Sequence, residues 1–471
     1  MPPPTESLSS ARSLPWVLLT LVFVMSLPAV TTRLYASDEI QYFAYLRSAY
    51  FDQDLSFENE YRYFYDENIA RAHFFKETFI DYVTPTGLRR NFAPIGSALL
   101  WAPFYAIADI GVRIARVFGA SVPGDGFSRP YISAITYGSA VYGFLALVLS
   151  AIAARRIVGV TAGTLAAVCF GTPLVFYMYV APGFSHANSA FAVAAFVVVW
   201  LHVRRRWSAG GVAALGALAA VMGMVREQDL FIALGPAIDY VVTVGRAVRA
   251  GERSPREMLL NAAIGVAAVA VCFLPQAMSY VVLHGHMGPS PVVQQKMTWT
   301  APNAWRVLVS PDNGWFFWSP VALLALIGLV ALASGYAGRE RRWIGTICVL
   351  MVATQIYVSG SLNTWAGAGS FGQRRLVGLS IFLVIGLASL LHMVRARPAR
   401  LAVNALVIVA VWWNLGLIAQ FATGLMNRNR VEPVRNAYNN FVTIPLEFPT
   451  LAYRYVFDRQ SFYQSRTPAS P

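Results

Sequence analysis

The sequence predicts an all-α polytopic membrane protein with about eleven transmembrane helices (10–13). Of its 471 residues, 56% are hydrophobic and 13% are charged, with a mean hydropathy of +0.51, so the chain is too apolar for a soluble globular domain. The apolar residues occur in blocks of about 20, the length that crosses a bilayer as one helix. Short arginine-bearing segments separate these blocks, a pattern typical of multi-pass proteins.

Eleven apolar blocks are expected to span the membrane. In chain order they are Pro15–Leu34, Tyr131–Ala154, Ile157–Val180, Ala187–Val203, Ala209–Val225, Leu230–Gly245, Met258–Leu283, Gly314–Ala337, Trp343–Ser359, Leu376–Val394 and Leu401–Gly424. We interpret the first as a retained helix rather than a cleaved signal peptide, because no small-residue cleavage site precedes a soluble domain.

A further block, Ala93–Phe118, is long enough to span the membrane but would then place Arg155-Arg156 on the outer side. Asp109, Arg113 and Arg116 are spaced along one face of it. This spacing favours an amphipathic helix lying at the outer surface, although a crossing remains the alternative.

The arginine clusters between the blocks predict the orientation, because short cytoplasmic loops are enriched in Lys and Arg. The formal net charge of +14 is therefore a topology signal rather than a nucleic-acid signature. The expected organisation is a cytoplasmic N-terminus (1–14), a first transmembrane helix (15–34), an extracytoplasmic loop with juxtamembrane helices (35–130), a helix bundle (131–424) and an extracytoplasmic C-terminal tail (425–471).

The most polar stretch, Tyr35–Ala93, follows the first apolar block directly and holds ten of the 23 Asp and Glu residues. Aromatic residues are interleaved throughout it. Because aromatic side chains with a polar edge concentrate at membrane–water interfaces, we expect them to hold the carboxylates at the bilayer edge. The sequence therefore predicts a reaction site at the membrane surface.

Asp38 and Glu39 stand where the first helix leaves the membrane. A carboxylate at this place can act as a general base that deprotonates an acceptor hydroxyl. The structural alternative is that Ser37 or Asp38 caps a helix over Glu39–Tyr50. Both roles can hold together, and the choice between Asp38 and Glu39 as the base stays open.

Arg226 lies in an Arg-Glu-Gln-Asp sequence that joins two spans with almost no loop. Ionisable groups at the edge of the hydrocarbon are costly, so they usually face a cavity or pair with each other. Arg226 is therefore expected either to reach a phosphate in a cavity or to form an ion pair with Glu227 or Asp229.

The glycine-rich segment 367–375 ends in Arg374-Arg375 at the outer start of a span. Flexible backbone N–H groups, a helix N-terminus and a guanidinium pair together make a candidate anion site. Arg90 is a weaker candidate of the same kind. Lys296 is expected to contact either lipid or phosphate.

Other chemistry-bearing residues are sparse. His186 is interpreted either as a structural, hydrogen-bonded histidine or as a functional one. Cys169, Cys272 and Cys348 all lie in apolar blocks, so neither a disulfide framework nor a metal cluster is indicated. No Walker loop, dinucleotide fingerprint or nucleophile elbow occurs, so a soluble nucleotide donor is not indicated.

The order of these features resembles that of GT-C glycosyltransferases. One N-terminal helix is followed by a large loop that opens with an acidic pair, and then by many helices with small arginine-bearing loops. The chain is most similar to the protein O-mannosyltransferase and aminoarabinose-transferase branch, the family-39-like proteins of GT-C type A. Local stretches that carry the resemblance are Arg90–Phe104, Ser185-His186-Ala187, Val225-Arg226 and Ser370–Leu376.

The resemblance implies a glycosyltransferase of the bacterial inner membrane. Its donor would be a polyprenyl-monophosphate-linked sugar, transferred with inversion to a lipid, glycan or protein acceptor on the periplasmic face, without a nucleic-acid partner. It implies Asp38 as the general base, with Glu39 as the fallback. The implied phosphate contacts are Arg374, Arg375, Arg226, Arg90 and Lys296, and further substrate contacts are His186, Asp229, Trp365 and Tyr42.

Two points qualify this comparison. The family often has Lys where this chain has Arg90-Asn91, a departure that concerns one of the phosphate contacts. No cofactor is expected, and metal independence is expected because the chain lacks the large soluble C-terminal domain of diphosphate-dependent relatives. The main alternative is a membrane transporter or flippase, against which the sequence shows no two-fold internal repeat.

Overall fold

The computed structural model describes residues 7–70, 73–367 and 369–458. Parts of the predicted N-terminus (1–14) and of the predicted tail (425–471) lie outside these residues, as does Ala368. Within the described chain the fold is all-helical, with two isolated β-bridges and no β-strand. Eight described helices are long and apolar enough to cross a membrane, as expected for a multi-pass membrane protein.

The N-terminal helix α1 (Ser7–Ser26) continues into a short 3₁₀ turn, Leu27–Ala29. The helical segment therefore begins before Pro15 and ends before Leu34, whereas the part of it that crosses the membrane stays a prediction. Pro28 accounts for the end, because proline removes a backbone donor and does not extend a helix.

Small helices form the polar stretch that follows α1. They are α2 (Ser37–Arg47), a π-helical turn (Ser48–Asp52), α3 (Glu58–Asp66), α4 (His73–Phe75) and a second π-helical turn (Lys76–Asp81). Aromatic side chains from several of them, including Phe43, Phe57, Tyr61 and Phe64, are fully buried against one another. Many of the aromatics thus form a core of their own, and the position of the carboxylates at the bilayer edge stays a prediction.

The next two helices, α5 (Gly96–Val117) and α6 (Arg129–Ile157), run antiparallel. The Tyr142 hydroxyl donates to the Leu100 carbonyl, whereas the Tyr131 hydroxyl donates to Asp109 further along α5. α5 therefore lies beside the first half of α6. By length and composition α5 is also a candidate span, so its position relative to a bilayer stays a prediction.

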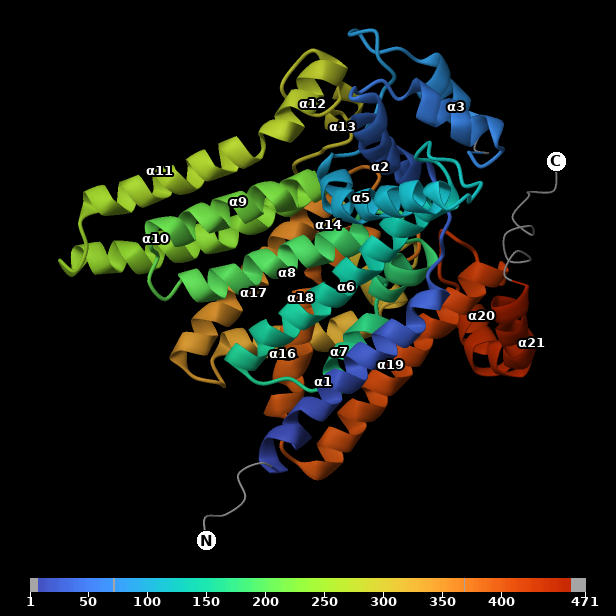
Figure 1. Cartoon of the computed structure of the whole chain (residues 1–471). Coiled ribbons are helices and arrows are strands. Elements are labelled where there is room, and N and C mark those ends of the chain that lie inside the picture. Colours follow the sequence, from blue (N-terminus) through green and yellow to red (C-terminus); the bar gives the residue numbers. More distant parts are fainter. Residues whose placement is uncertain (1–6, 71–72, 368, 459–471) are drawn as a thin grey trace.

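The remaining helices form the bundle in Figure 1. Its longer members are α7 (Ala162–Phe170), α8 (His186–Val203), α9 (Ala209–Val225), α10 (Leu234–Arg249), α11 (Pro255–Cys272), α12 (Leu274–His284), α16 (Pro320–Ser334), α17 (Arg339–Gly360), α18 (Ser380–Met393) and α19 (Arg397–Thr423). Short segments between them are η4 (Phe176–Val180), η5 (Glu227–Ala233), α13 (Pro291–Gln294), α14 (Ala304–Val309), α15 (Trp315–Trp318) and η6 (Arg374–Leu379). The chain ends in α20 (Pro433–Tyr438), η7 (Asn439–Thr443) and α21 (Ile444–Phe457).

Three predicted spans are broken in the structure. Ile157–Val180 is divided between α7 and η4, Met258–Leu283 between α11 and α12, and Gly314–Ala337 between α15 and α16. Each break has a proline at or next to it, namely Pro173, Pro275 or Pro320. Because proline has no backbone N–H group to donate to the preceding turn, it interrupts the helix there. Hydropathy alone did not detect these interruptions.

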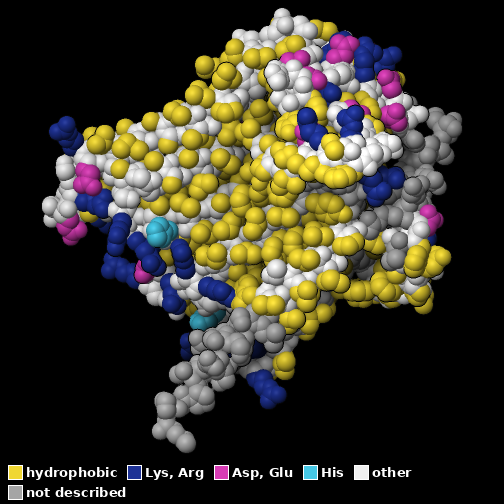
Figure 2. All heavy atoms as spheres, viewed as in Figure 1, with side chains coloured by type: hydrophobic (Ala, Val, Ile, Leu, Met, Phe, Trp, Pro, Cys, Tyr) yellow, Lys and Arg dark blue, Asp and Glu magenta, His cyan; other side chains and the backbone are white. Residues whose placement is uncertain are grey.

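Arginine-bearing segments meet at one end of the bundle. Arg204, after α8, lies 3.6 Å from Glu340 at the start of α17. Arg253, between α10 and α11, donates to the Arg206 carbonyl. Figure 2 shows Lys and Arg side chains gathered at the left of the view, where α10 and α11 meet in Figure 1, beside a broad hydrophobic face. We call this place the arginine-rich end.

Candidate functional site

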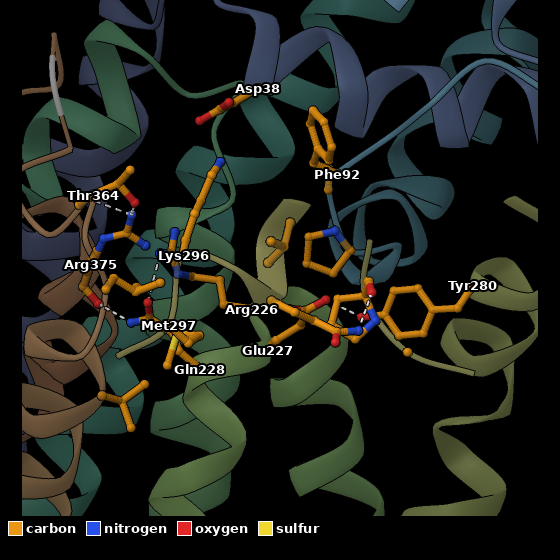
Figure 3. Close-up of a pocket in the computed structure, with 18 of the residues that line it drawn as sticks. Asp38, Phe92, Arg226, Glu227, Gln228, Tyr280, Lys296, Met297, Thr364 and Arg375 are labelled. Atoms are coloured by element: carbon orange, nitrogen blue, oxygen red, sulfur yellow. Dashed lines mark hydrogen bonds between the residues drawn. The ribbon is translucent and has the colours of Figure 1, made fainter. Parts of the chain in front are cut away.

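A cavity of about 930 Å³ lies at the opposite end of the bundle (Figure 3). Its walls come from the starts of α2, α8 and η6, from the junction of α9 with η5, from α12 and from the segment 287–299. The predicted site residues that line it are Asp38, Tyr42, His186, Arg226, Lys296, Arg374 and Arg375. Segments more than 330 residues apart therefore contribute to one site, since Asp38 and Arg374 are 336 positions apart.

The neighbouring carboxylates of Asp38 and Glu39 have different environments. Glu39 Oε2 accepts hydrogen bonds from the backbone amides of Tyr35 and Ala36 at 2.8 and 3.0 Å, and its side chain is buried. Asp38 instead lines the cavity, where its Oδ2 lies 2.9 Å from Arg374 Nη1. The side chain that caps α2 is thus Glu39, so the predicted cap at Ser37 or Asp38 is wrong. Asp38 is the acid that lines the cavity.

The glycine-rich segment before η6 makes a tight turn. Gly367, Gly369 and Gly372 have φ of 57°, 74° and 62°, in the left-handed region that favours glycine. A Cβ atom at Gly372 would lie 2.7 Å from Pro173, so the backbone approaches its neighbour closely.

Several backbone amides of this turn donate to acceptors within the protein. The amides of Gly369, Ser370 and Arg374 donate to Asn429 Oδ1, to the Gly367 carbonyl and to the Gly372 carbonyl. The prediction that these amides bind an anion is therefore not supported. Of this segment, Arg374 and Arg375 line the cavity, whereas Gly367, Gly369 and Gly372 do not.

Arg375 lines the cavity beside Arg374. Its Nη2 donates to both the carbonyl and the hydroxyl of Thr364 at 3.1 Å. These partners are neutral, and among the described residues Arg375 has no ion-pair partner. Its positive charge is therefore available to a ligand.

The guanidinium group of Arg226 pairs with neither of its predicted acidic partners within the described chain, although the Asp229 amide donates to the Arg226 carbonyl at 2.8 Å. Its Nη1 lies 2.6 Å from His186 Nδ1, and its Nη2 lies 3.5 Å from Gln228 Oε1. Because arginine only donates, the imidazole nitrogen must accept. No ion pair with Glu227 or Asp229 occurs within the described chain, so the predicted structural pair is wrong and His186 positions the guanidinium.

Tyr42 and Lys296 complete the predicted set. The Tyr42 hydroxyl accepts a hydrogen bond of 2.9 Å from Ser185 Oγ, and burial raises the pKa of this phenol, which keeps it neutral. Lys296 Nζ lies 5.8 Å from the centre of the Phe92 ring and forms no ion pair with a described residue. The lysine thus adds a further uncompensated cation to the cavity.

Three other predicted residues lie away from the cavity lining. Arg90 stacks on the Tyr82 ring, 3.1 Å from its centre, in the polar stretch. Asp229 is buried and accepts a 2.6 Å hydrogen bond from Ser189 Oγ. Trp365 is nearly buried in the hydrophobic core. The geometry gives these side chains packing or supporting contacts.

Several residues that line the cavity were not predicted from the sequence. Gln41 follows Asp38 by three positions on α2, and its side-chain oxygen accepts from the Phe92 amide at 2.7 Å, which ties the segment after Arg90 to α2. This i, i+3 spacing was a usable signal. Glu227 and Tyr280 also line the cavity, and no sequence signal connects them.

The site can bind an anion. Its lining includes the cationic side chains of Arg226, Lys296, Arg374 and Arg375. Only Arg374 has a carboxylate partner among the described residues. Much of the remaining wall is apolar, with the side chains of Phe92, Phe184, Phe231, Phe273, Met297, Trp299 and Val358. A cavity of this kind suits a ligand with an anionic group and an apolar part.

Comparisons with known proteins do not assign the site. No family model and no curated protein sequence matches this chain. No group of three potential metal ligands occurs among the residues that the structure describes, and metal independence stays a prediction.

Proposed function

We propose that this protein is an integral-membrane glycosyltransferase that uses a polyprenyl-monophosphate sugar as its donor. The observation that carries the proposal is the position of Asp38. It lies in a cavity that also holds four cationic side chains and apolar walls. A lipid phosphate matches the cations and the polyprenyl chain matches the apolar walls.

In the proposed reaction, Asp38 accepts the proton of an acceptor hydroxyl. The hydroxyl oxygen then forms a bond to the anomeric carbon, while the bond between that carbon and the phosphate oxygen breaks. The electron pair leaves on the polyprenyl phosphate, and this single displacement inverts the anomeric configuration. Fixed guanidinium groups offset the charge that develops on the departing phosphate.

Arg374 has a second part in this proposal. Its 2.9 Å contact holds the Asp38 carboxylate at the cavity wall, and it also belongs to the cation cluster. We assign the reaction to the periplasmic face of a bacterial inner membrane, because the arginine-rich end would then be cytoplasmic. The acceptor would be a lipid, glycan or protein hydroxyl.

The test is donor turnover by the purified protein in lipid. Polyprenyl phosphates that carry labelled hexoses or pentoses are incubated with an envelope extract as acceptor, and released polyprenyl phosphate is measured. Asp38→Asn keeps the size of the side chain but removes the base, so we expect turnover to fall by about 10²–10⁴-fold. Asp66→Asn, at an exposed acid of the same polar stretch, is the control and should leave turnover unchanged.

Each other outcome has a definite meaning. Normal turnover by Asp38→Asn would move the base elsewhere, with Glu39 next. If the wild-type protein binds none of these donors, the glycosyltransferase proposal fails, and vesicle transport assays should follow, because a transporter or flippase becomes the leading candidate.

A further inference from the structure

Glu227 and Tyr280 form a polar pair on the cavity wall. Glu227 is the first residue of η5 and Tyr280 lies on α12, and both line the cavity. The Tyr280 hydroxyl donates to Glu227 Oε1. Figure 3 shows the pair on the side of the cavity away from Thr364 and Arg375.

The carboxyl group of Glu227 has few contacts of its own. Although Arg226 precedes it directly, that guanidinium turns to His186 and Gln228. Among the described residues, Glu227 has no ion-pair partner and no hydrogen-bond donor besides Tyr280. A carboxyl group so poorly compensated in a largely apolar site is costly. A ligand that donates hydrogen bonds would satisfy it.

The surroundings of the pair suit a compact polar ligand with apolar faces. Phe92, Pro94, Phe273 and Ala277 line the same cavity. Figure 3 shows Phe92 on the upper part of the wall, above Glu227. A carboxylate has several acceptor positions and a phenol can donate and accept. Adjacent hydroxyl groups on a saturated ring match this combination.

We propose that Glu227 and Tyr280 bind hydroxyl groups of the donor's sugar. This inference rests on the proposed function. With the phosphate at Arg226, Arg374 and Arg375, the polar pair lies across the cavity from Arg375. Arg375 and the Glu227–Tyr280 pair therefore lie on different sides of the cavity, an arrangement that would orient a sugar phosphate in one direction. Glu227 and Tyr280 act as positioning and specificity residues, whereas Asp38 performs the proton transfer.

The test compares two probes on the full-length protein in lipid nanodiscs without an acceptor. One is a polyprenyl phosphate and the other is the same lipid carrying a hexose or pentose, with the donor that the wild type binds most tightly chosen for the variants. Glu227→Gln should weaken binding of the glycosylated lipid by about 10–100-fold, because a hydrogen bond to a charged group is lost. Binding of the sugar-free lipid should not change.

Matched measurements separate this role from a structural one. Arg375→Gln should weaken both probes alike, and Tyr280→Phe should weaken only the glycosylated one. In the wild type, a deoxy donor that lacks the contacted hydroxyl should bind weakly, and Glu227→Gln should cause no further loss with that donor. In turnover assays Glu227→Gln should raise KM much more than it lowers kcat.

Several results would overturn the inference. Equal effects of Glu227→Gln on both lipid probes, or no effect on either, would show that the pair does not bind the donor's sugar. An effect on the acceptor KM alone would assign the pair to the acceptor. Melting temperatures of each variant show whether the fold persists, and Tyr280→Phe provides the second variant if Glu227→Gln unfolds. If the wild type binds neither lipid, the proposed function itself has failed.

Discussion

The two ends of the helix bundle differ in how far their charged side chains are paired. At the arginine-rich end, the buried Asp239 of α10 accepts hydrogen bonds on both oxygens, from Trp200 Nε1 and Arg204 Nε at 2.9 Å and from Trp343 Nε1 at 2.6 Å. At the cavity end, Arg375 has only neutral partners and Lys296 has no ion pair among the described residues.

The difference separates a structural charge cluster, in which every charge has a partner, from a cluster whose cations are free to bind a ligand. Asp239 is fully buried and completely compensated, so it joins α8, α10 and α17 and leaves nothing for a substrate. The cavity end retains an excess of positive charge next to open volume. Such an excess is costly in a folded protein unless a ligand offsets it, which is the physical reason for placing function there.

The largest expected effect tests the structural side of this comparison. Asp239→Asn leaves Arg204 without its buried carboxylate partner and replaces one of the two acceptor oxygens by an N–H₂ group that faces a donor, which should cost about 3–5 kcal/mol of unfolding free energy. Thermal unfolding in detergent measures it. Asp38→Asn, in the partly open cavity, should melt close to the wild type. Equal melting of Asp239→Asn and the wild type would remove the distinction between the ends.

The next largest effect concerns the unpaired cations at the cavity end. Arg375→Gln should weaken binding of polyprenyl phosphate by about 10–100-fold, because it removes a charge-assisted contact without leaving any carboxylate unpaired. Titration of the lipid in nanodiscs measures this. Arg205→Gln, at an exposed arginine of the other end, is the matched control. If both variants bind alike, the excess charge of the cavity has no role in recognition.

A buried acid of the polar stretch, Glu60, is compensated less fully than Asp239, although it has an ion pair with Arg47. Glu60 shares Arg47 with Asp52, and burial raises the pKa of Glu60 to about 7 because desolvation outweighs its ion pair with Arg47. The folded state then binds more protons than the unfolded state between about pH 4.5 and 7. The stabilising contribution of Glu60 is therefore greatest below that range and is lost as the pH rises through 7.

The Glu60→Gln variant isolates this effect. It should gain stability relative to the wild type by on the order of 1–3 kcal/mol when the pH rises from about 5 to 8. Melting curves of both proteins across this range measure the difference. A constant difference would mean that Glu60 stays ionised in the folded protein at all of these pH values.

The smallest effect concerns Glu39. Glu39→Gln weakens the contacts to the amides of Tyr35 and Ala36, which should cost about 0.5–2 kcal/mol of stability. Turnover should fall far less than in Asp38→Asn. Melting and turnover of the two variants, measured together, check this. A loss of turnover as large as that of Asp38→Asn would make Glu39 the base.

Much of the helical architecture was predictable, because hydropathy reports which segments prefer an apolar environment. The bounds were less predictable. Pro173, Pro275 and Pro320 interrupt segments whose average hydropathy is continuous, and Pro28 ends the first one early. Window averages do not detect the loss of a single backbone donor. The buried aromatic core of the polar stretch was also missed, because amphipathic aromatic residues suit both an interface and a core.

The sequence by itself determined the class of protein and the residue types available to a site. It placed an acidic pair after the first helix and arginines before later ones, because composition and spacing are local properties. Only the tertiary structure separated Asp38 from Glu39, turned Arg226 to His186 and brought Glu227 to Tyr280. These outcomes depend on which side chains meet across distant segments, and packing decides that.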